Sequence, residues 1–256
     1  MALQLSHAVS DGIRRILTRT GGVLFLGLLA IQFGTQASVN TAILGYLPPD
    51  VAPQFSSNVG ITLPISGPAA LAVFGVLVVL SSAYFVVLSR AFAQPLSEAG
   101  RFPESVTQRL GRATAIALVG GLIVSVSVAI GSVFLLVPGL FLAASFLFFI
   151  FAVAVEDRGV IGSLKRSWGL ARGSRLQLGV LVFVSVLFGG FIGALAPILT
   201  LAGAPVAADI AIIVLSTVFF LPYYAIIASA YLQLRDGQPG RDRSRPDPVD
   251  ASVPEL

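Results

Sequence analysis

The sequence contains no cysteine and only one histidine, one lysine and one tryptophan. The absence of cysteine excludes disulfides, thiolate metal sites and cysteine nucleophiles. Charge is scarce as well, because charged residues make up 11% of the 256 residues, against about 25% in a soluble globular domain. So few charges could not cover a water-soluble surface of this size, so the composition excludes an ordinary soluble domain.

Catalytic and metal-binding motifs are also missing. The chain has no H-E-x-x-H, G-x-S-x-G, glycine-rich phosphate loop or paired-carboxylate motif. His7 lies in a basic segment without a partner for catalysis and is expected to be a solvated interface residue. We therefore expect no metal, no cofactor and no enzymatic activity, with an intramembrane enzyme as the least favoured alternative.

Apolar residues are abundant, at 56% of the chain, and they gather in runs between charged clusters. Runs of about 20 such residues cross the ~30 Å hydrocarbon core of a bilayer. The predicted fold class is all-α: a polytopic membrane protein with six transmembrane helices paired as three hairpins. The predicted spans are 22–44, 68–88, 113–136, 140–155, 176–199 and 206–232. The flanking segments are a cytoplasmic basic amphipathic segment, 1–21, and a disordered cytoplasmic tail, 235–256.

The distribution of positive charge gives the predicted topology. All 16 Lys and Arg residues fall before the first span, in 89–112, in 156–175 or in the tail, and none falls in 45–67, 137–139 or 200–205. Short basic loops stay on the cytoplasmic side, so both termini are predicted to be cytoplasmic in a multi-pass protein of the plasma membrane. A cleaved signal peptide over the first span would enter in the same orientation and stays open as an alternative.

The stretch 113–155 tests the number of spans because it has no charged residue. As one helix it would be about 65 Å long, twice the hydrocarbon thickness. It must therefore fold back, and Pro138-Gly139 is the predicted break.

Each predicted hairpin follows a basic segment with an apolar stripe. Leu5, Val9, Ile13 and Leu17 recur at helical spacing before the first span, and Phe102, Val106 and Leu110 do so after Pro103. Before the fifth span, Ile161, Leu164, Trp168 and Ala171 share one face, with Lys165, Arg166 and Arg172 on others. Such helices lie in the membrane interface, so the expected partner is a bilayer with anionic headgroups and not nucleic acid.

Polar residues within the spans are few. Gln32, Gln36 and Asn40 are spaced by four and share one helix face. Amides in hydrocarbon are costly unless paired, so this face is a candidate polar intramembrane face that either bonds to neighbouring helices, the preferred interpretation, or lines a pathway. Asp209 is interpreted as a first-turn charge favoured by the helix dipole. Pro222 is a candidate kink in the last span.

The segment from Val155 to Gly173 places two acids, Glu156 and Asp157, just before the basic helix. Glu156 or Asp157 is expected to pair with Lys165, Arg166 or Arg172 and hold that helix against the span. The candidate headgroup and interface contacts are Glu156, Lys165, Arg166, Trp168 and Arg172.

This segment, together with Pro138-Gly139, resembles the membrane domain of some glycerophosphoryl diester phosphodiesterases and of YciC-like membrane proteins of unknown function. The matching residues are Pro138-Gly139, Glu156, Gly159, Leu164-Lys165-Arg166-Ser167-Trp168 and Arg172-Gly173, whereas Ser163 stands where alanine is usual. The resemblance implies the membrane module alone, because the phosphodiesterase reaction belongs to a separate soluble barrel with acidic metal ligands and histidines.

Two functional hypotheses follow from these patterns. The first is a non-enzymatic membrane module that acts as a scaffold, a lipid-contacting unit or a subunit of a protein partner or homo-oligomer. The alternative is a transporter or channel for a small polar or lipid-like molecule that uses the amide face and Pro222.

Overall fold

The computed structural model describes residues 3–134 and 136–237, and within these ranges the chain is helical, with no β-strand. The helices are α1 (Leu5–Ile16), α2 (Arg19–Tyr46), α3 (Ala52–Ser56), α4 (Gly67–Phe92), α5 (Leu110–Phe134), α6 (Leu136–Phe146), α7 (Phe149–Ala154), α8 (Val160–Ala171), α9 (Arg175–Leu201) and α10 (Pro205–Asp236). Two 3-10 turns, η1 (Leu96–Glu98) and η2 (Glu104–Thr107), precede α5. Most of the tail predicted to be disordered lies outside the described residues.

Six helical segments of the described chain are long and apolar enough to cross a membrane, in agreement with the predicted all-α polytopic fold. Their bounds lie within a few residues of the predicted spans, except that the fourth segment, Val137–Ala154, contains two helices, α6 and α7. Local signals mark several starts: Thr18 accepts a hydrogen bond from the Gly21 N–H at 3.1 Å before α2, and Pro205 begins α10.

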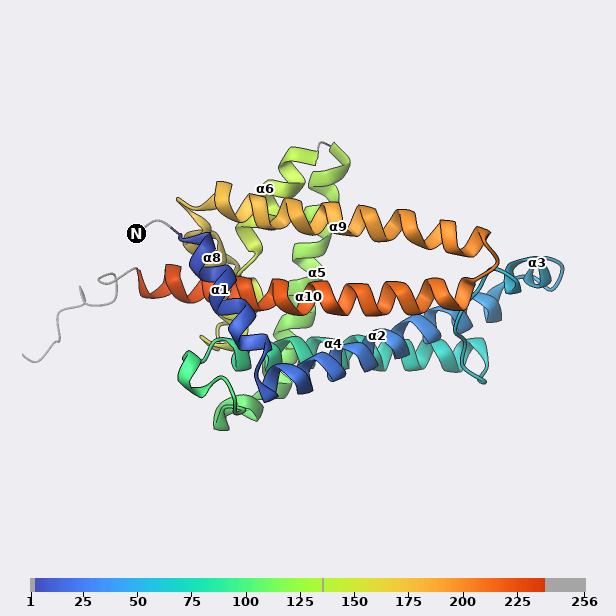
Figure 1. Cartoon of the computed structure of the whole chain (residues 1–256), viewed down its shortest axis with the longest axis horizontal. Coiled ribbons are helices and arrows are strands. Elements are labelled where there is room, and N and C mark those ends of the chain that lie inside the picture. Colours follow the sequence, from blue (N-terminus) through green and yellow to red (C-terminus); the bar gives the residue numbers. More distant parts are fainter. Residues whose placement is uncertain (1–2, 135, 238–256) are drawn as a thin grey trace, which may run out of the picture.

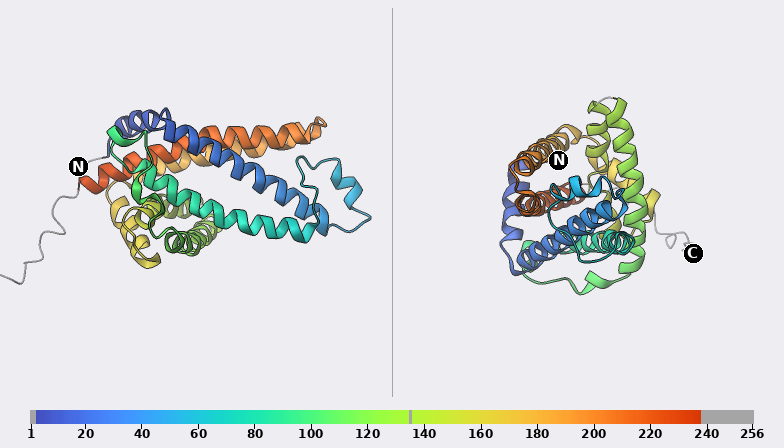
Figure 2. Two further views of the ribbon diagram at one scale, coloured as in Figure 1. Left: turned by 90° about the horizontal axis from the view of Figure 1, so that it is seen from below. Right: turned by 90° about the vertical axis from the view of Figure 1, so that its right-hand side faces the viewer.

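The long helices do not all run in one direction. α2, α4, α9 and α10 extend along the long axis of the molecule, whereas α5 and α6 form a hairpin that runs across it (Figure 1). The view along the long axis shows α5 upright beside α2, α4 and α10, which are seen nearly end-on (Figure 2). α1, α8 and the C-terminal end of α10 lie at one end of the molecule, and α3 lies at the other.

The predicted break at Pro138-Gly139 is displaced. α5 ends at Phe134 and α6 already begins at Leu136, so Pro138 and Gly139 lie in the first turn of α6. Proline is tolerated there because the first N–H groups of a helix have no intrahelical acceptor. Gly139 allows the two helices to approach closely, since a Cβ at this position would collide with the side chain of Ser132 on α5.

The largest buried cluster lies at the end where α1 and α8 join the long helices. It includes Phe92 of α4, Phe148 between α6 and α7, Leu170 of α8 and Tyr231 of α10, each at most 2% exposed. At the other end the contacts are narrower: α2 and α4 approach backbone to backbone at Gly45 and Gly67, where a Cβ would not fit. The fold therefore positions most of its packing around the basic segments.

Two of the three expected amphipathic segments are helices. α1 packs against α10, with Gly12 close to the backbone of Ile226, and α8 packs against α6 and α7. The segment before α5 is different, because Pro103 begins only the single turn η2 and no helix covers 89–109 beyond α4. Arg90 donates to three carbonyls of this segment, and that backbone is therefore held without an α-helix.

Candidate functional site

Glu156 is the centre of a polar cluster at the basic end. Its carboxylate accepts hydrogen bonds from Arg158 Nε at 2.6 Å, Arg166 Nε at 2.9 Å and Tyr231 Oη at 2.7 Å. Burial alone would raise the pKa of Glu156, but the hydrogen bonds from Arg166, Tyr231 and Arg158 outweigh burial and hold this pKa below its ordinary value. The ionised carboxylate thereby joins the end of α7 to α8 and α10.

The basic residues of α8 divide between an inner and an outer face. Arg166 turns inward to Glu156, as one of the predicted pairings requires. Lys165 and Arg172 are exposed, and neither forms an ion pair or a side-chain hydrogen bond within the described ranges. These two cations therefore remain available to an external anion.

Trp168 contributes an aromatic surface next to these cations. Its indole is 38% exposed, and the guanidinium carbon of Arg175 lies 4.4 Å from the centre of the Trp168 ring and 4.7 Å from that of Phe141. Stacking on two aromatic faces stabilises a cation that has no acid beside it. Nε and Nη2 of Arg175 are buried and make no hydrogen bond to the described residues.

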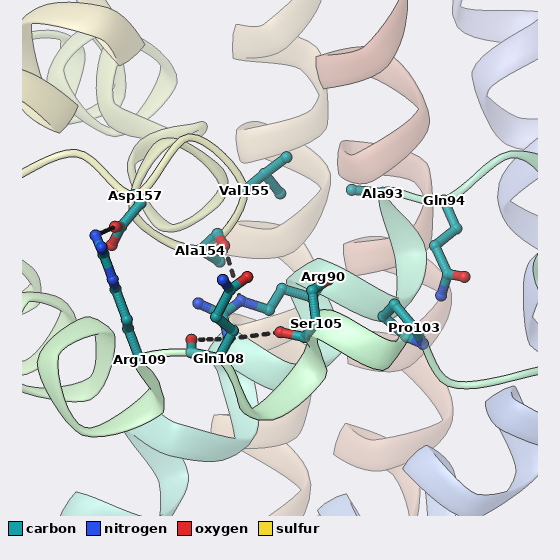
Figure 3. A pocket seen from close by; sticks show the side chains of 10 residues that line it. All are labelled: Arg90, Ala93, Gln94, Pro103, Ser105, Gln108, Arg109, Ala154, Val155 and Asp157. Carbon is teal, nitrogen blue, oxygen red and sulfur yellow. Dashed lines mark hydrogen bonds and ion pairs between the residues drawn. The ribbon is translucent and has the colours of Figure 1, made fainter.

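Arg90, near the end of α4, lines a cavity of about 440 Å³ at the same end of the molecule. Its Nε donates to the Ala154 carbonyl at 2.8 Å, and its Nη1 donates to the carbonyls of Ser105, Val106 and Gln108 at 2.8–3.2 Å. Figure 3 shows the guanidinium between α7 and the segment before α5. A single arginine thus donates hydrogen bonds to backbone carbonyls of two segments that are not paired with each other in a helix or a sheet.

An ion pair closes one side of this cavity. Arg109 Nη1 lies 2.8 Å from Asp157 Oδ2 (Figure 3). Arg112 Nη1 lies 3.6 Å from the same oxygen. Both Arg109 and Asp157 adopt a left-handed backbone conformation, with φ of 47° and 48°. Such conformations cost about 1 kcal/mol or more in a residue other than glycine, and the pair compensates part of that cost.

Arg15 anchors α1. It is 4% exposed, and its Nη1 donates to the Phe92 carbonyl at 2.7 Å and the Gln94 carbonyl at 2.5 Å. Phe92 is the last residue of α4 and Gln94 lies two residues beyond it, at a helix end where carbonyls lack intrahelical donors and favour a positive charge. Burial lowers the pKa of Arg15 from its ordinary value.

A second polar cluster lies at the opposite end of the molecule, around Asp209. The carboxylate accepts hydrogen bonds from Gln36 Nε2 at 3.1 Å, Asn40 Nδ2 at 2.8 Å and the Ile61 N–H at 2.8 Å. Asp209 is 7% exposed and lies in the second turn of α10. It is therefore a buried acceptor between helices, and the interpretation as a first-turn dipole charge is wrong.

Only two of the three residues of the predicted amide face belong to this cluster. Gln36 and Asn40 both reach Asp209, and Asn40 also donates to the Ile61 carbonyl at 3.0 Å. Gln32, one turn earlier, makes no side-chain hydrogen bond in the described part of the chain. The two paired amides hold α2, α10 and the loop between α3 and α4 together, as interhelical bonding requires.

Pro222 lies inside α10, which continues through it to Asp236. The next two residues, Tyr223 and Tyr224, line a cavity of about 550 Å³ between α10 and the α5–α6 hairpin. The remaining lining is mostly apolar. Pro222 lies 13 residues after Asp209, the residue of α10 that Gln36 and Asn40 contact, so the structure does not bring Pro222 and the amide pair into one site.

A model of a domain of unknown function, DUF7847, matches residues 3–234. The chain belongs to the DUF7847 family. No curated protein and no solved structure matches the chain.

Membership of the DUF7847 family supports a membrane protein of unknown activity. The comparisons do not link the chain to glycerophosphoryl diester phosphodiesterase membrane domains or to YciC-like proteins, so that resemblance gains no support. The residues that suggested it have a structural account here, because Glu156 and Arg166 pair and Ser167 Oγ donates to the Ser145 carbonyl at 2.9 Å.

Sequence analysis missed several residues that build these clusters. Arg90, Arg15 and Arg175 were counted only as topology signals, although each contacts a defined partner. Tyr231 gave no signal, since a tyrosine near a span end is ordinary. Asp209 had one usable signal: it is the acid closest to the middle of a predicted span, where a carboxylate requires donors.

Proposed function

We propose that this DUF7847 protein is a non-enzymatic membrane module that contacts anionic lipid headgroups through its basic end. The observation that carries the proposal is the outer face of α8. There, Lys165 and Arg172 are exposed cations without a partner among the residues that the structure describes, next to the partly exposed ring of Trp168.

The chemistry of this face suits a phosphate-bearing headgroup. A basic residue near an anionic surface contributes about 1 kcal/mol of attraction. The tryptophan ring favours the boundary between headgroups and chains. Arg166 is committed to Glu156, which fixes the orientation of α8 and leaves Lys165 and Arg172 on the outside.

The positive-inside rule places this face at the cytoplasmic surface of the plasma membrane, with both termini on that side. A scaffold role for a protein partner or for a homo-oligomer is compatible with the same arrangement. The proposal includes no metal or cofactor, and it includes no catalytic step.

Trp168 provides the test, because it is the only tryptophan in the chain. The purified protein is reconstituted into vesicles of equal parts phosphatidylglycerol and phosphatidylcholine, with brominated chains on one lipid or the other. Bromine quenches tryptophan on contact. We expect stronger quenching when phosphatidylglycerol carries the bromine, and we expect this preference to weaken at high salt, where screening shortens to about 3 Å at 1 M.

The variant Lys165→Ala/Arg172→Ala is expected to lose most of the preference. Arg14→Ala/Arg19→Ala is the matched control, because it removes the same charge from exposed positions outside α8 and should leave the preference at Trp168 in place. Equal quenching by the two brominated lipids in the unaltered protein would contradict the proposal.

The transporter alternative has less support. Asp209, which binds the amides Gln36 and Asn40, is separated from Pro222 by about 20 Å along α10 at 1.5 Å per residue. Neither Gln36 nor Asn40 lines the cavities beside Arg90 or Pro222. Flux of a small solute through vesicles of the pure protein would revive this alternative.

A further inference from the structure

We propose that the α5–α6 hairpin does not cross the bilayer. The hairpin enters from the basic face, lies among the acyl chains of the leaflet on that side and returns to the same face through α7. The chain then crosses four times, through α2, α4, α9 and α10. The partner of the hairpin surface is the hydrocarbon of a single leaflet.

The first observation is the place of Phe141. This residue follows the α5–α6 connection closely, so a crossing hairpin would carry it to the outer surface, about 30 Å from the basic face. Instead, the Phe141 ring lies 5.6 Å from the Trp168 ring and 4.7 Å from the guanidinium of Arg175. Trp168 and Arg175 both belong to the basic segment between α7 and α9, so the beginning of α6 lies at the level of that segment.

The second observation is the part of α9 that α6 contacts. Ala144 of α6 belongs to one buried cluster with Leu178 and Val182 of α9, and Leu140 packs against the same cluster. Leu178 lies in the first turn of α9, which begins at Arg175. A crossing hairpin would place the beginning of α6 beside the other end of α9, near Leu201.

The third observation is the change of partner along α5. Ala113 and Ala117 cluster with Val86 near the end of α4, whereas Val128 and Ala129, further along α5, line a cavity with Tyr224 of α10. A helix that runs parallel to its neighbours keeps the same partners along its length. α5 instead passes from one long helix to another, in agreement with its upright course in the axial view (Figure 2).

The outer surface of the α5–α6 hairpin is apolar and requires a hydrocarbon environment, although the hairpin does not run parallel to the other long helices. Its outer positions are large apolar side chains that are 41–84% exposed: Val119, Leu122, Ile123, Val126, Ile130, Val133, Val137 and Phe141. The hydroxyls of Ser127 and Ser132 donate to carbonyls of their own helix, as a lipid environment demands. Exposure of this apolar face to water would be unfavourable, so lipid acyl chains are the environment that suits it.

The charge distribution is the same for four and for six crossings. A hairpin that enters and leaves by one face returns Arg112 and Arg158 to the same side, whatever depth its turn reaches. The position of the turn is therefore the quantity to measure.

The absence of cysteine allows single-cysteine probes in the full chain, reconstituted in vesicles. A bimane fluorophore on Phe141→Cys is quenched only when a tryptophan lies in near contact. We expect loss of bimane fluorescence, restored by adding Trp168→Phe. Bimane on Leu201→Cys, an exposed position at the far end of α9, serves as the control and should be unaffected by Trp168. Unquenched Phe141→Cys would overturn the proposal.

Labelling with an impermeant maleimide assigns the side of the turn independently. Ser56→Cys, exposed in α3, should react from the outer face, and Ser97→Cys, exposed in η1, should react from the inner face. We expect Val137→Cys to resist labelling from the outer face, where Ser56→Cys reacts. Reaction of Val137→Cys from the outer face would overturn the proposal.

Discussion

At the scale of the residue, Glu156 shows how one ionised side chain determines the position of a helix. The variant Glu156→Gln keeps the size of the side chain but removes the charge that Arg158, Arg166 and Tyr231 share. Hydrogen bonds to a charged group contribute about 1.5–3 kcal/mol, so we expect a loss of this order in the free energy of unfolding at neutral pH. Thermal unfolding in detergent measures it, with exposed Glu98→Gln as the unaffected control.

The pH dependence of the same site has a defined sign. Because the pKa of Glu156 in the folded protein lies below the ordinary carboxyl value of about 4.3, its contribution is complete above that value. The contribution is lost as the pH falls from there through the folded pKa. The difference in stability between the unaltered protein and Glu156→Gln should therefore shrink in this acidic window, and a difference that grew on acidification would contradict the account.

Asp209 has a different chemical constraint, since its three protein partners are all donors. The variant Asp209→Asn would place an amide N–H₂ among them and leave a buried donor unpaired, at a cost of about 1–3 kcal/mol. We expect lower thermal stability and faster hydrogen exchange at the Ile61 amide. Asp50→Asn changes an exposed acid of the same outer loop and is the control. Unchanged exchange at Ile61 would mean that Asp209 does not hold the loop.

At the scale of the element, α1 is attached to the end of α4 through Arg15. This side chain is buried, whereas Arg14 on the same helix is exposed. Arg15→Lys keeps the charge but shortens the side chain by one bond, so Nζ reaches less far than Arg15 Nη1, which donates to both the Phe92 and the Gln94 carbonyl. We expect a loss of about 1–3 kcal/mol and faster exchange of the α1 amides. Arg14→Lys is the control, because Arg14 is exposed on the same helix. Equal effects of the two variants would show that the two hydrogen bonds of Arg15 Nη1 are not required.

The elements also show where periodicity is informative. α1 and α8 form where apolar residues recur at helical spacing without proline, and both were predicted. The segment before α5 has a similar apolar spacing but forms only short turns, because Pro103 limits the conformations of its neighbours and Arg90 pairs with the backbone there. Pro138 was taken as a break, yet the first turn of α6 accommodates it, so a proline alone does not locate a turn to within a residue.

At the scale of the whole molecule, the four long helices and the transverse hairpin follow from different constraints. α2, α4, α9 and α10 each begin or end near basic residues and are long enough to cross a bilayer. The hairpin has the same apolar composition, but the contacts of Phe141 with Trp168 and Arg175 hold it near one end. Hydropathy measures only transfer into hydrocarbon and is the same for a helix that crosses and for one that lies within a leaflet.

The sequence by itself determined that the chain is helical and membrane-embedded, because a chain with 11% charge and long apolar runs must satisfy its backbone internally in lipid. It also indicated which face carries the cations and that Glu156 or Asp157 pairs with a residue of the basic helix, as Glu156 does with Arg166. Only the tertiary structure decided that Asp209 is a buried acceptor, that Arg109 pairs with Asp157, and that the hairpin runs across the bundle. These features depend on contacts between residues distant in the chain, and neither spacing nor hydropathy of a single segment contains that information.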